Sequence, residues 1–144
     1  MARPFTFTNQ FHQDVHHAVH NFDTHQYNVL FTNTQPLVSD AVLADLTEIT
    51  PGDGYPAGGI ALTKVSSIQT AGIFRHIVQD DVASASGGPI GPFQWVALYN
   101  VTQTTPLKPV VGWWDMGQPT TILDGDDWPM NFDDVEGIIR SPGS

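Results

Sequence analysis

The chain has 144 residues, the usual size of one domain, and no cysteine, so disulfides, zinc–thiolate sites and thiol nucleophiles are excluded. Fifteen acidic and five basic residues give a net charge of −10, which disfavours binding to a nucleic-acid backbone or to an anionic membrane surface. Apolar residues make up 40% of the sequence, enough for a core in a chain of this length, and 13 glycines with 11 prolines favour short strands joined by turns.

The N-terminal region predicts an arm followed by a helix. Residues 1–8 are predicted to be an extended arm. Residues 10–21 are predicted to form one short amphipathic helix, because apolar residues recur at helical spacing. The inward positions of this helix are Phe11, Val15, Val19 and Phe22. Its opposite face carries His12, Gln13, Asp14, His16 and His20.

From residue 27 onward the pattern is typical of strands. Alternation at residues 27–32 predicts a half-buried strand. Residues 41–49 are ambiguous, and one interpretation is a helical turn with Val42, Leu43 and Leu46 facing inward. The segment 93–100 is apolar on both faces, which predicts a central, covered strand. Phe93, Trp95, Ala97 and Tyr99 are assigned to one face, and Val96 and Leu98 to the other. Further strands are predicted at 60–66 and 73–79, paired across a turn at 70–72, and at 110–115, 120–123, 128–132 and 135–140.

Short strands at this spacing predict a mainly β fold, either a sandwich or a jelly-roll-like barrel, with one short N-terminal helix. A single domain is expected over residues 9–140, and residues 141–144 are expected to be a flexible tail. Two stretches rich in Gly and Pro, at 50–59 and 84–92, are predicted to be loops.

The histidines are the first candidates for chemistry. Five of the six fall within residues 12–25, and His12, His16 and His20 are spaced by four, so the predicted helix places them on one face. We interpret them as a polar helix face. A zinc, nickel or copper site and a pH-dependent subunit contact are the alternatives. A zinc-protease helix is excluded, because no Glu lies between His16 and His20.

The acidic clusters are interpreted as solvated turns. Asp124-Gly125-Asp126-Asp127 resembles the start of a calcium loop, but the ligands that an EF-hand needs further on are missing. The pairs Asp80-Asp81 and Asp133-Asp134 have the residue types of a glycosidase, but nothing in the sequence places them across a cleft.

Nucleophile and phosphate-binding motifs are missing from the sequence. There is no Gly-x-Ser-x-Gly elbow, and Gly87, Gly88 and Gly91 form neither a dinucleotide fingerprint nor a phosphate loop. The sequence therefore predicts no catalytic residues, no cofactor and no metal ligands, and we expect no enzymatic activity.

Adjacent tryptophans mark a possible contact surface. Trp113 and Trp114 lie in one predicted strand and must face opposite ways, so one of them is either covered by a second layer or exposed at a binding surface.

Several segments together resemble a family of small tailed-phage virion proteins, which are head decoration, cement or tail-associated proteins. Each segment is short, but the set spans most of the chain in the same order. The segments are Phe7-Thr8-Asn9-Gln10-Phe11, Val19-His20-Asn21-Phe22, Tyr27-Asn28-Val29-Leu30-Phe31-Thr32-Asn33, Glu48-Ile49, Gly54-Tyr55-Pro56-Ala57-Gly58-Gly59, Phe93-Gln94-Trp95-Val96-Ala97-Leu98-Tyr99-Asn100 and Gly112-Trp113-Trp114-Asp115.

This resemblance implies a structural component of a virion. The expected role is that of a capsid decoration (cement) protein, which clamps capsid subunits by multivalent contacts and has the major capsid protein or neighbouring virion proteins as partners. A homo-oligomer is expected, with a trimer favoured because capsids have local threefold axes. The arm and the loops at 50–59 and 84–92 are the candidate gripping segments.

Two alternatives remain at this stage. One is a tail- or fibre-associated adaptor or adhesin in which Trp113 or Trp114 stacks on a sugar. The other is a small enzyme that uses a metal held by the histidines. No stretch approaches the roughly 20 apolar residues that span a bilayer, and Met1–Pro4 lacks an apolar signal-peptide core. We therefore expect synthesis in the host cytoplasm, and the virion as the final location.

Overall fold

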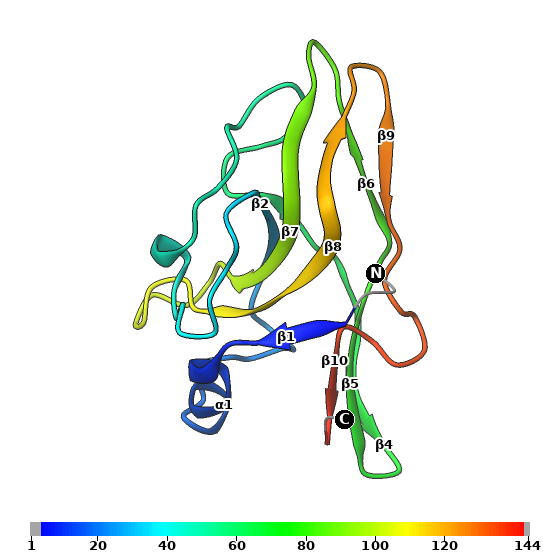
Figure 1. The fold of residues 1–144 in the computed structure, drawn as a ribbon. Helices are drawn as coiled ribbons and strands as arrows, with labels where there is room; N and C mark the ends of the chain where they lie inside the picture. Colours follow the sequence, from blue (N-terminus) through cyan, green and yellow to red (C-terminus); the bar gives the residue numbers. More distant parts are fainter. Residues whose placement is uncertain (1–3, 143–144) are drawn as a thin grey trace.

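The computed structural model describes residues 4–142, which form a mainly β body with one α-helix and one short 3-10 helix (Figure 1). The elements in chain order are β1 (Phe5–Phe7), α1 (Asn9–His16), β2 (Tyr27–Thr32), η1 (Leu43–Asp45), β3 (Ile60–Ala61), β4 (Lys64–Thr70), β5 (Ile73–Val78), β6 (Asp81–Ser84), β7 (Ile90–Asn100), β8 (Val110–Ile122), β9 (Asp127–Met130) and β10 (Ile139–Ser141).

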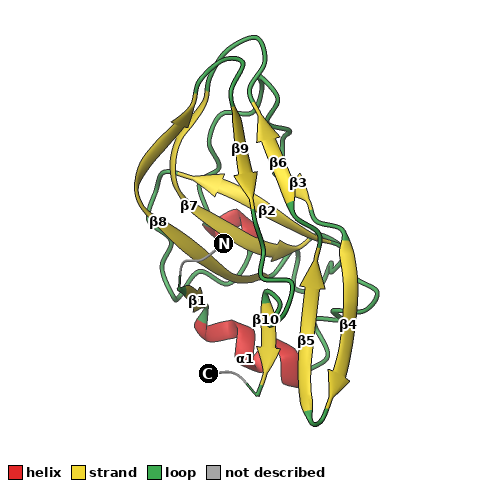
Figure 2. Cartoon of the chain, turned by 90° about the vertical axis from the view of Figure 1, so that its right-hand side faces the viewer, coloured by secondary structure: helices red, strands yellow, loops and turns green. Residues whose placement is uncertain are grey.

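Three antiparallel sheets pack in the manner of a sandwich. Their strand orders are β1-β8-β7-β2-β3, β10-β5-β4 and β6-β9. Figure 2 shows the two smaller sheets in front of the five-stranded sheet. Between the layers, Trp128 of β9 meets Phe31 and Phe93 edge-on, with ring centroids 5.6 and 5.1 Å apart. The predicted mainly β, sandwich-like class is confirmed, whereas the sheets of residues 4–142 do not close into a barrel.

Strand β7 is central, as its two apolar faces predict, because it pairs with β2 on one side and with β8 on the other. Val96 faces the main core between the sheets, and Tyr99 faces a second core on the outside of the five-stranded sheet. The predicted placement of Phe93 beside Trp95 is wrong, since Phe93 lies in the main core. The register against β8 shifts between these two residues, and a bulge of this kind re-aims the neighbouring side chains.

Strand β8 runs through residues 116–119, which separate two strands in the sequence prediction. Residues 116–119 lie opposite the single residue Gln94 of β7, so the ladder is interrupted without ending the strand. Gly117, at φ 90°, adopts the left-handed backbone that this irregularity requires. The two strands predicted at 110–115 and 120–123 are therefore one strand.

The N-terminal segment is part of the sheet. Strand β1 pairs with β8 and places Phe7 opposite Gly112. A Cβ at Gly112 would overlap the backbone carbonyl of Thr6, so a side chain there would force the two strands apart. Residues 5–7 of the predicted arm, residues 1–8, are extended as predicted, and they pair with β8 as an edge strand of the sheet. Residues 1–3 lie outside the described part.

Helix α1 is shorter than the predicted helix over 10–21. It ends in a Schellman motif, in which Ala18 adopts the left-handed φ of 59° and the N–H of Val19 donates to the carbonyl of Asp14 at 2.8 Å. A left-handed residue stops the helix, so the chain turns away after His16.

The buried face of α1 also differs from the prediction. Phe11 is buried as predicted, but Val15 is 40% exposed, and Asp14, predicted on the polar face, is 4% exposed. Gln10 donates a hydrogen bond to the Asp14 carboxylate at 3.0 Å and so partners one of its oxygens. Helix α1 has eight residues and contains only Phe11 and Val15 of the four predicted inward positions, so the helical spacing does not extend to Val19 and Phe22.

Strands β4 and β5 form a hairpin that extends beyond the lower end of the five-stranded sheet (Figure 1). Ala71 and Gly72, at φ 54° and 81°, form the tight turn between Thr70 and Ile73, so the predicted pairing is confirmed. Strand β10 pairs with β5 and includes Ser141, so the predicted tail at 141–144 begins with a strand residue. Residues 143–144 are not described.

Candidate docking surfaces

The outside of the five-stranded sheet carries a second, smaller core. Trp113 of β8 packs there with Leu30, Ala97, Tyr99 and Val110, and the segment around η1 covers it through Leu43 and Leu46. The ambiguous segment at 41–49 is thus a covering layer with one 3-10 turn, and Leu43 and Leu46 face inward as the helical-turn interpretation predicts.

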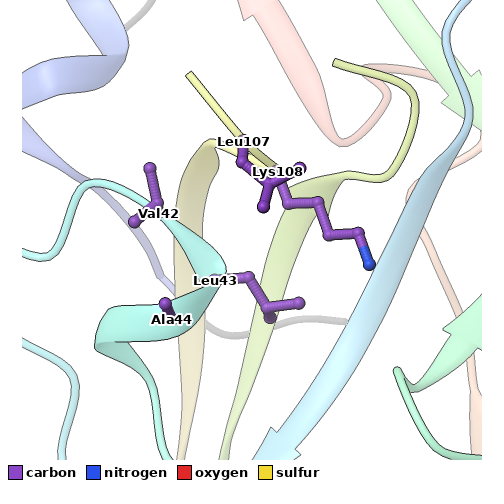
Figure 3. A pocket seen from close by; sticks show the side chains of 5 residues that line it. All are labelled: Val42, Leu43, Ala44, Leu107 and Lys108. Carbon is purple, nitrogen blue, oxygen red and sulfur yellow. The ribbon is translucent and has the colours of Figure 1, made fainter. Parts of the chain in front are cut away.

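An apolar groove opens where this covering layer meets the loop before β8 (Figure 3). We call it the Leu107 groove. One wall is formed by Val42, Leu43 and Ala44, and the other by Leu107 and the aliphatic stem of Lys108. Its volume is about 300 Å³. The lining is almost wholly hydrocarbon, which is the character of a site for apolar side chains.

Backbone hydrogen bonds hold the two walls of the groove together. The N–H of Leu43 donates to the carbonyl of Lys108 at 2.9 Å, and the N–H of Val110 donates to the carbonyl of Ala41 at 2.9 Å. The Asp45 carboxylate accepts from the N–H groups of Ala41 and Val42, which fixes the turn that begins η1. The groove is therefore formed by fixed backbone, and binding would not have to order it first.

Lys108 places a positive charge beside the groove. In Figure 3 its stem passes Leu43, and its amino group points away from Val42. Among residues 4–142 the other cations are all paired: Lys64 with Asp23, and Arg75 and Arg140 with Glu136. No ion pair involves Lys108 within the same residues. On a chain with a net charge of −10, an unpaired lysine next to an apolar groove favours a ligand that carries a carboxylate.

A second exposed apolar feature is the turn at residues 133–137, which we call the Val135 turn. Val135 is 69% exposed, the highest value among the exposed large apolar side chains of the described residues. The Asp133 carboxylate accepts from the N–H groups of Val135 and Glu136 at 2.9 and 2.8 Å, and these bonds lower the pKa of Asp133. Most of the strand predicted at 135–140 is therefore turn, because an aspartate side chain organises the backbone locally.

The Val135 turn is also anchored to the three-stranded sheet. Glu136 forms ion pairs with Arg75 of β5 at 3.2 Å and with Arg140 of β10 at 2.7 Å. Asp134, between the capping aspartate and the exposed valine, has no hydrogen bond or ion pair within the described residues. The turn thus presents one apolar side chain and one unpaired carboxylate on a fixed backbone.

The two features lie on opposite sides of the molecule. Figure 1 shows η1 and the loop before β8 on the left, and the loop between β9 and β10 on the right, with the β body between them. One copy of the chain therefore cannot place its own Val135 turn in its own groove.

The predicted histidine stripe does not form. His12 and His16 are exposed on α1, but the helix ends before His20, which is 8% exposed and packs between Phe11 and Tyr27. The prediction that the three histidines share one helix face is therefore wrong.

Two histidines are buried instead. Burial lowers the pKa of His20 to about 4, with a smaller effect from the charge of His25. It also lowers the pKa of His76 on β5 to about 4, with a smaller effect from Lys64. Asn100 donates to His25 Nδ1 at 2.8 Å, and its amide nitrogen lies 3.3 Å from His20 Nδ1. This polar network is largely buried, and a small cavity of about 30 Å³ lies beside His25, Tyr27 and His76.

The aspartates of the acidic clusters accept hydrogen bonds that join neighbouring segments. Asp124 accepts from the N–H of Gly87 at 3.0 Å, and Asp127 accepts from the hydroxyl of Ser84 at 2.7 Å. Asp80 accepts from the N–H of Phe132 at 2.8 Å, which brings the pair Asp80-Asp81 close to the pair Asp133-Asp134. Within residues 4–142 no three His, Asp or Glu side chains gather as metal ligands would.

Both adjacent tryptophans are buried. Trp113 is 7% exposed and Trp114 is 3% exposed, so the hypothesis that either ring stacks on a sugar is wrong.

The predicted loops at 50–59 and 84–92 contact one another, since the N–H of Ser86 donates to the carbonyl of Asp53 at 2.9 Å.

Comparison with known proteins adds no relative: no protein-family model, no curated protein and no solved structure matches the chain. In the described residues, no helix combines the length and the apolarity that crossing a bilayer requires.

Sequence reasoning missed the groove and misread the turn. Val42 and Leu43 are identifiable as apolar positions of an ambiguous segment, but Leu107 lies in a polar connection with no periodic pattern. The signal for the turn was Asp133, whose spacing from Val135 and Glu136 is that of an Asx turn.

Proposed function

We propose that this chain is a structural, non-enzymatic component of a tailed-phage particle, and specifically a capsid decoration protein that clamps capsid subunits. The observation that carries the proposal is the presence of two apolar contact features, the Leu107 groove and the Val135 turn, on opposite sides of one rigid β body. A protein that joins neighbours in a shell needs contacts on two sides. The ordered resemblance of the sequence to small virion proteins also supports it.

The acidic composition is consistent with this role. A net charge of −10 keeps a particle surface soluble and disfavours contact with packaged DNA. Each contact feature is small, so a single copy would bind weakly. Many symmetric copies on one shell would bind firmly, because the contacts add through multivalency.

The test is a cryo-EM map of the particle that carries this chain. Density for the β body on the outer capsid surface, at a copy number that scales with the number of capsid subunits, is the expected result. A handful of copies at the tail would replace decoration with the tail- or fibre-associated alternative. Absence of the chain from purified particles would refute a virion role altogether.

A further inference from the structure

The Leu107 groove and the Val135 turn are complementary in chemistry. The groove offers an apolar lining with one unpaired cation, Lys108, and the turn offers an exposed apolar side chain with one unpaired anion, Asp134. We propose that the Leu107 groove of one copy receives the Val135 turn of a second copy, with Asp134 placed against Lys108. This inference rests on the proposed function, because it supplies the contact that joins copies of a decoration oligomer.

The distribution of charge determines where a second copy can dock. Because the chain carries 15 acidic and five basic residues, most of its surface repels another copy. A stable contact between copies must therefore pair one of the few cations with an acid. Of the cations in residues 4–142, Lys108 alone has no ion pair within the chain, so it can meet an acid without breaking an existing pair.

Size and order also match. A volume of about 300 Å³ lies at the lower end of the range for ligand pockets, so the groove suits one or two side chains better than a whole helix. The turn is held by Asp133 at its start and by the ion pairs of Glu136 at its end. A turn that is ordered before binding loses little conformational entropy when it docks.

The placement of the two features determines the type of assembly. Since they are different patches on opposite sides, each copy uses its groove with one neighbour and its turn with another. Such a contact is heterologous, and its repetition closes into a ring when the rotation allows. The trimer expected from capsid symmetry is a ring of this kind.

The absence of native cysteine allows a direct test by disulfide trapping. Chains carrying Leu107→Cys and chains carrying Val135→Cys are mixed under mild oxidation, and a disulfide between the two variants is expected. Both positions are more than half exposed, so neither substitution disturbs the core. The control replaces Val135→Cys by Leu123→Cys, which is as exposed as Leu107 but lies on a different loop. Equal yields from the two mixtures, or no disulfide in either, would overturn the contact.

A charge swap gives an independent readout by sedimentation velocity across a concentration series. Lys108→Glu and Asp134→Lys should each weaken self-association about tenfold, because each places like charges together. The two changes in one chain should restore it. If both single variants sediment like the wild type, the contact between copies is wrong. If Lys108→Glu instead removes binding to particles without changing self-association, the groove holds a capsid segment, and the proposed function stands without this inference.

Discussion

Trp113 and Trp114 are neighbours in strand β8, yet their rings belong to different hydrophobic cores. Trp114 lies between the sheets, where its ring centroid is 4.7 Å from that of Phe5. Trp113 lies on the outside of the five-stranded sheet beneath Leu43. Strand alternation separates them, and the Leu107 groove is built on the layer that Trp113 supports.

Trp114→Ala should lower the free energy of unfolding by about 3–5 kcal/mol, because it leaves a large cavity in the main core. Trp113→Ala should cost less, since its cover is only partly buried, but it should loosen the wall of the groove. Urea denaturation measures the first effect, and methyl NMR shifts of Leu43 measure the second. Large Leu43 shifts in Trp114→Ala but not in Trp113→Ala would contradict the separation of the two cores.

Gly112→Ala should detach strand β1 from β8, because a Cβ there overlaps the backbone carbonyl of Thr6. We expect the free energy of unfolding to fall by about 1–3 kcal/mol, and hydrogen exchange to become faster at the amides that join the two strands. Gly88→Ala is the matched control, since its new Cβ would meet the movable carboxylate of Asp53. Equal effects from both substitutions would mean that β1 is not held by this close approach.

The histidines of the N-terminal region should separate into two classes. His16→Ala should change stability by less than about 0.5 kcal/mol, whereas His20→Ala should cost about 2–3 kcal/mol, because only His20 is buried. A chelator should leave the melting temperature of the wild type unchanged. A large drop in chelator that is abolished by His16→Ala would reveal a metal held by the exposed histidines.

Stability should fall with acid between about pH 6.5 and 4. His20 and His76 have a pKa of about 4 in the folded chain and near 6.5 when unfolded, so the unfolded chain binds more protons in this window. The contribution of these histidines to the free energy of unfolding is therefore complete above pH 6.5. It decreases below this pH, by up to about 1.4 kcal/mol per pH unit for each histidine.

His76→Phe should make this dependence on pH shallower, with His20 causing the remainder, while keeping stability near neutral pH. Within the described residues His76 Nδ1 has no hydrogen-bond partner, and its ring already packs against Phe22 with centroids 5.2 Å apart. His16→Phe, at an exposed position, should leave the pH profile unchanged. Identical profiles for wild type and His76→Phe would show that burial of His76 does not control the response to acid.

The chain should not shift a DNA duplex in a gel at low salt, because its net charge of −10 repels phosphates. Tight binding that weakens steeply with salt would contradict this.

The sequence was most informative where one local signal dominated. A run of apolar residues on both faces predicted the strand that became β7, and a Gly-containing turn predicted the hairpin of β4 and β5. Prediction failed where a single backbone event changed the pattern. Ala18 in a left-handed conformation ended α1 early and moved His20 into the core, and the bulge opposite Gln94 joined two predicted strands.

The docking features were harder to predict for a different reason. The walls of the Leu107 groove come from segments more than 60 residues apart, and they meet through backbone hydrogen bonds such as that from Leu43 to Lys108. Backbone bonds leave no pattern in side-chain polarity. The Val135 turn has a local signal in Asp133, but the apolar residues Val135, Ile138 and Ile139 led to the prediction of a strand.

The pairing of β1 with β8 has a consequence for synthesis on the ribosome. The first strand leaves the exit tunnel roughly a hundred residues before its partner, since Thr8 bonds to Val110. During that interval Phe5 and Phe7 have no sheet to join, and β8, once made, has an open edge until they return. Both are surfaces on which nascent chains associate. Synthesis that is faster than the pairing of β1 with β8 should therefore favour inclusion bodies, and slower expression at low temperature should favour folded protein.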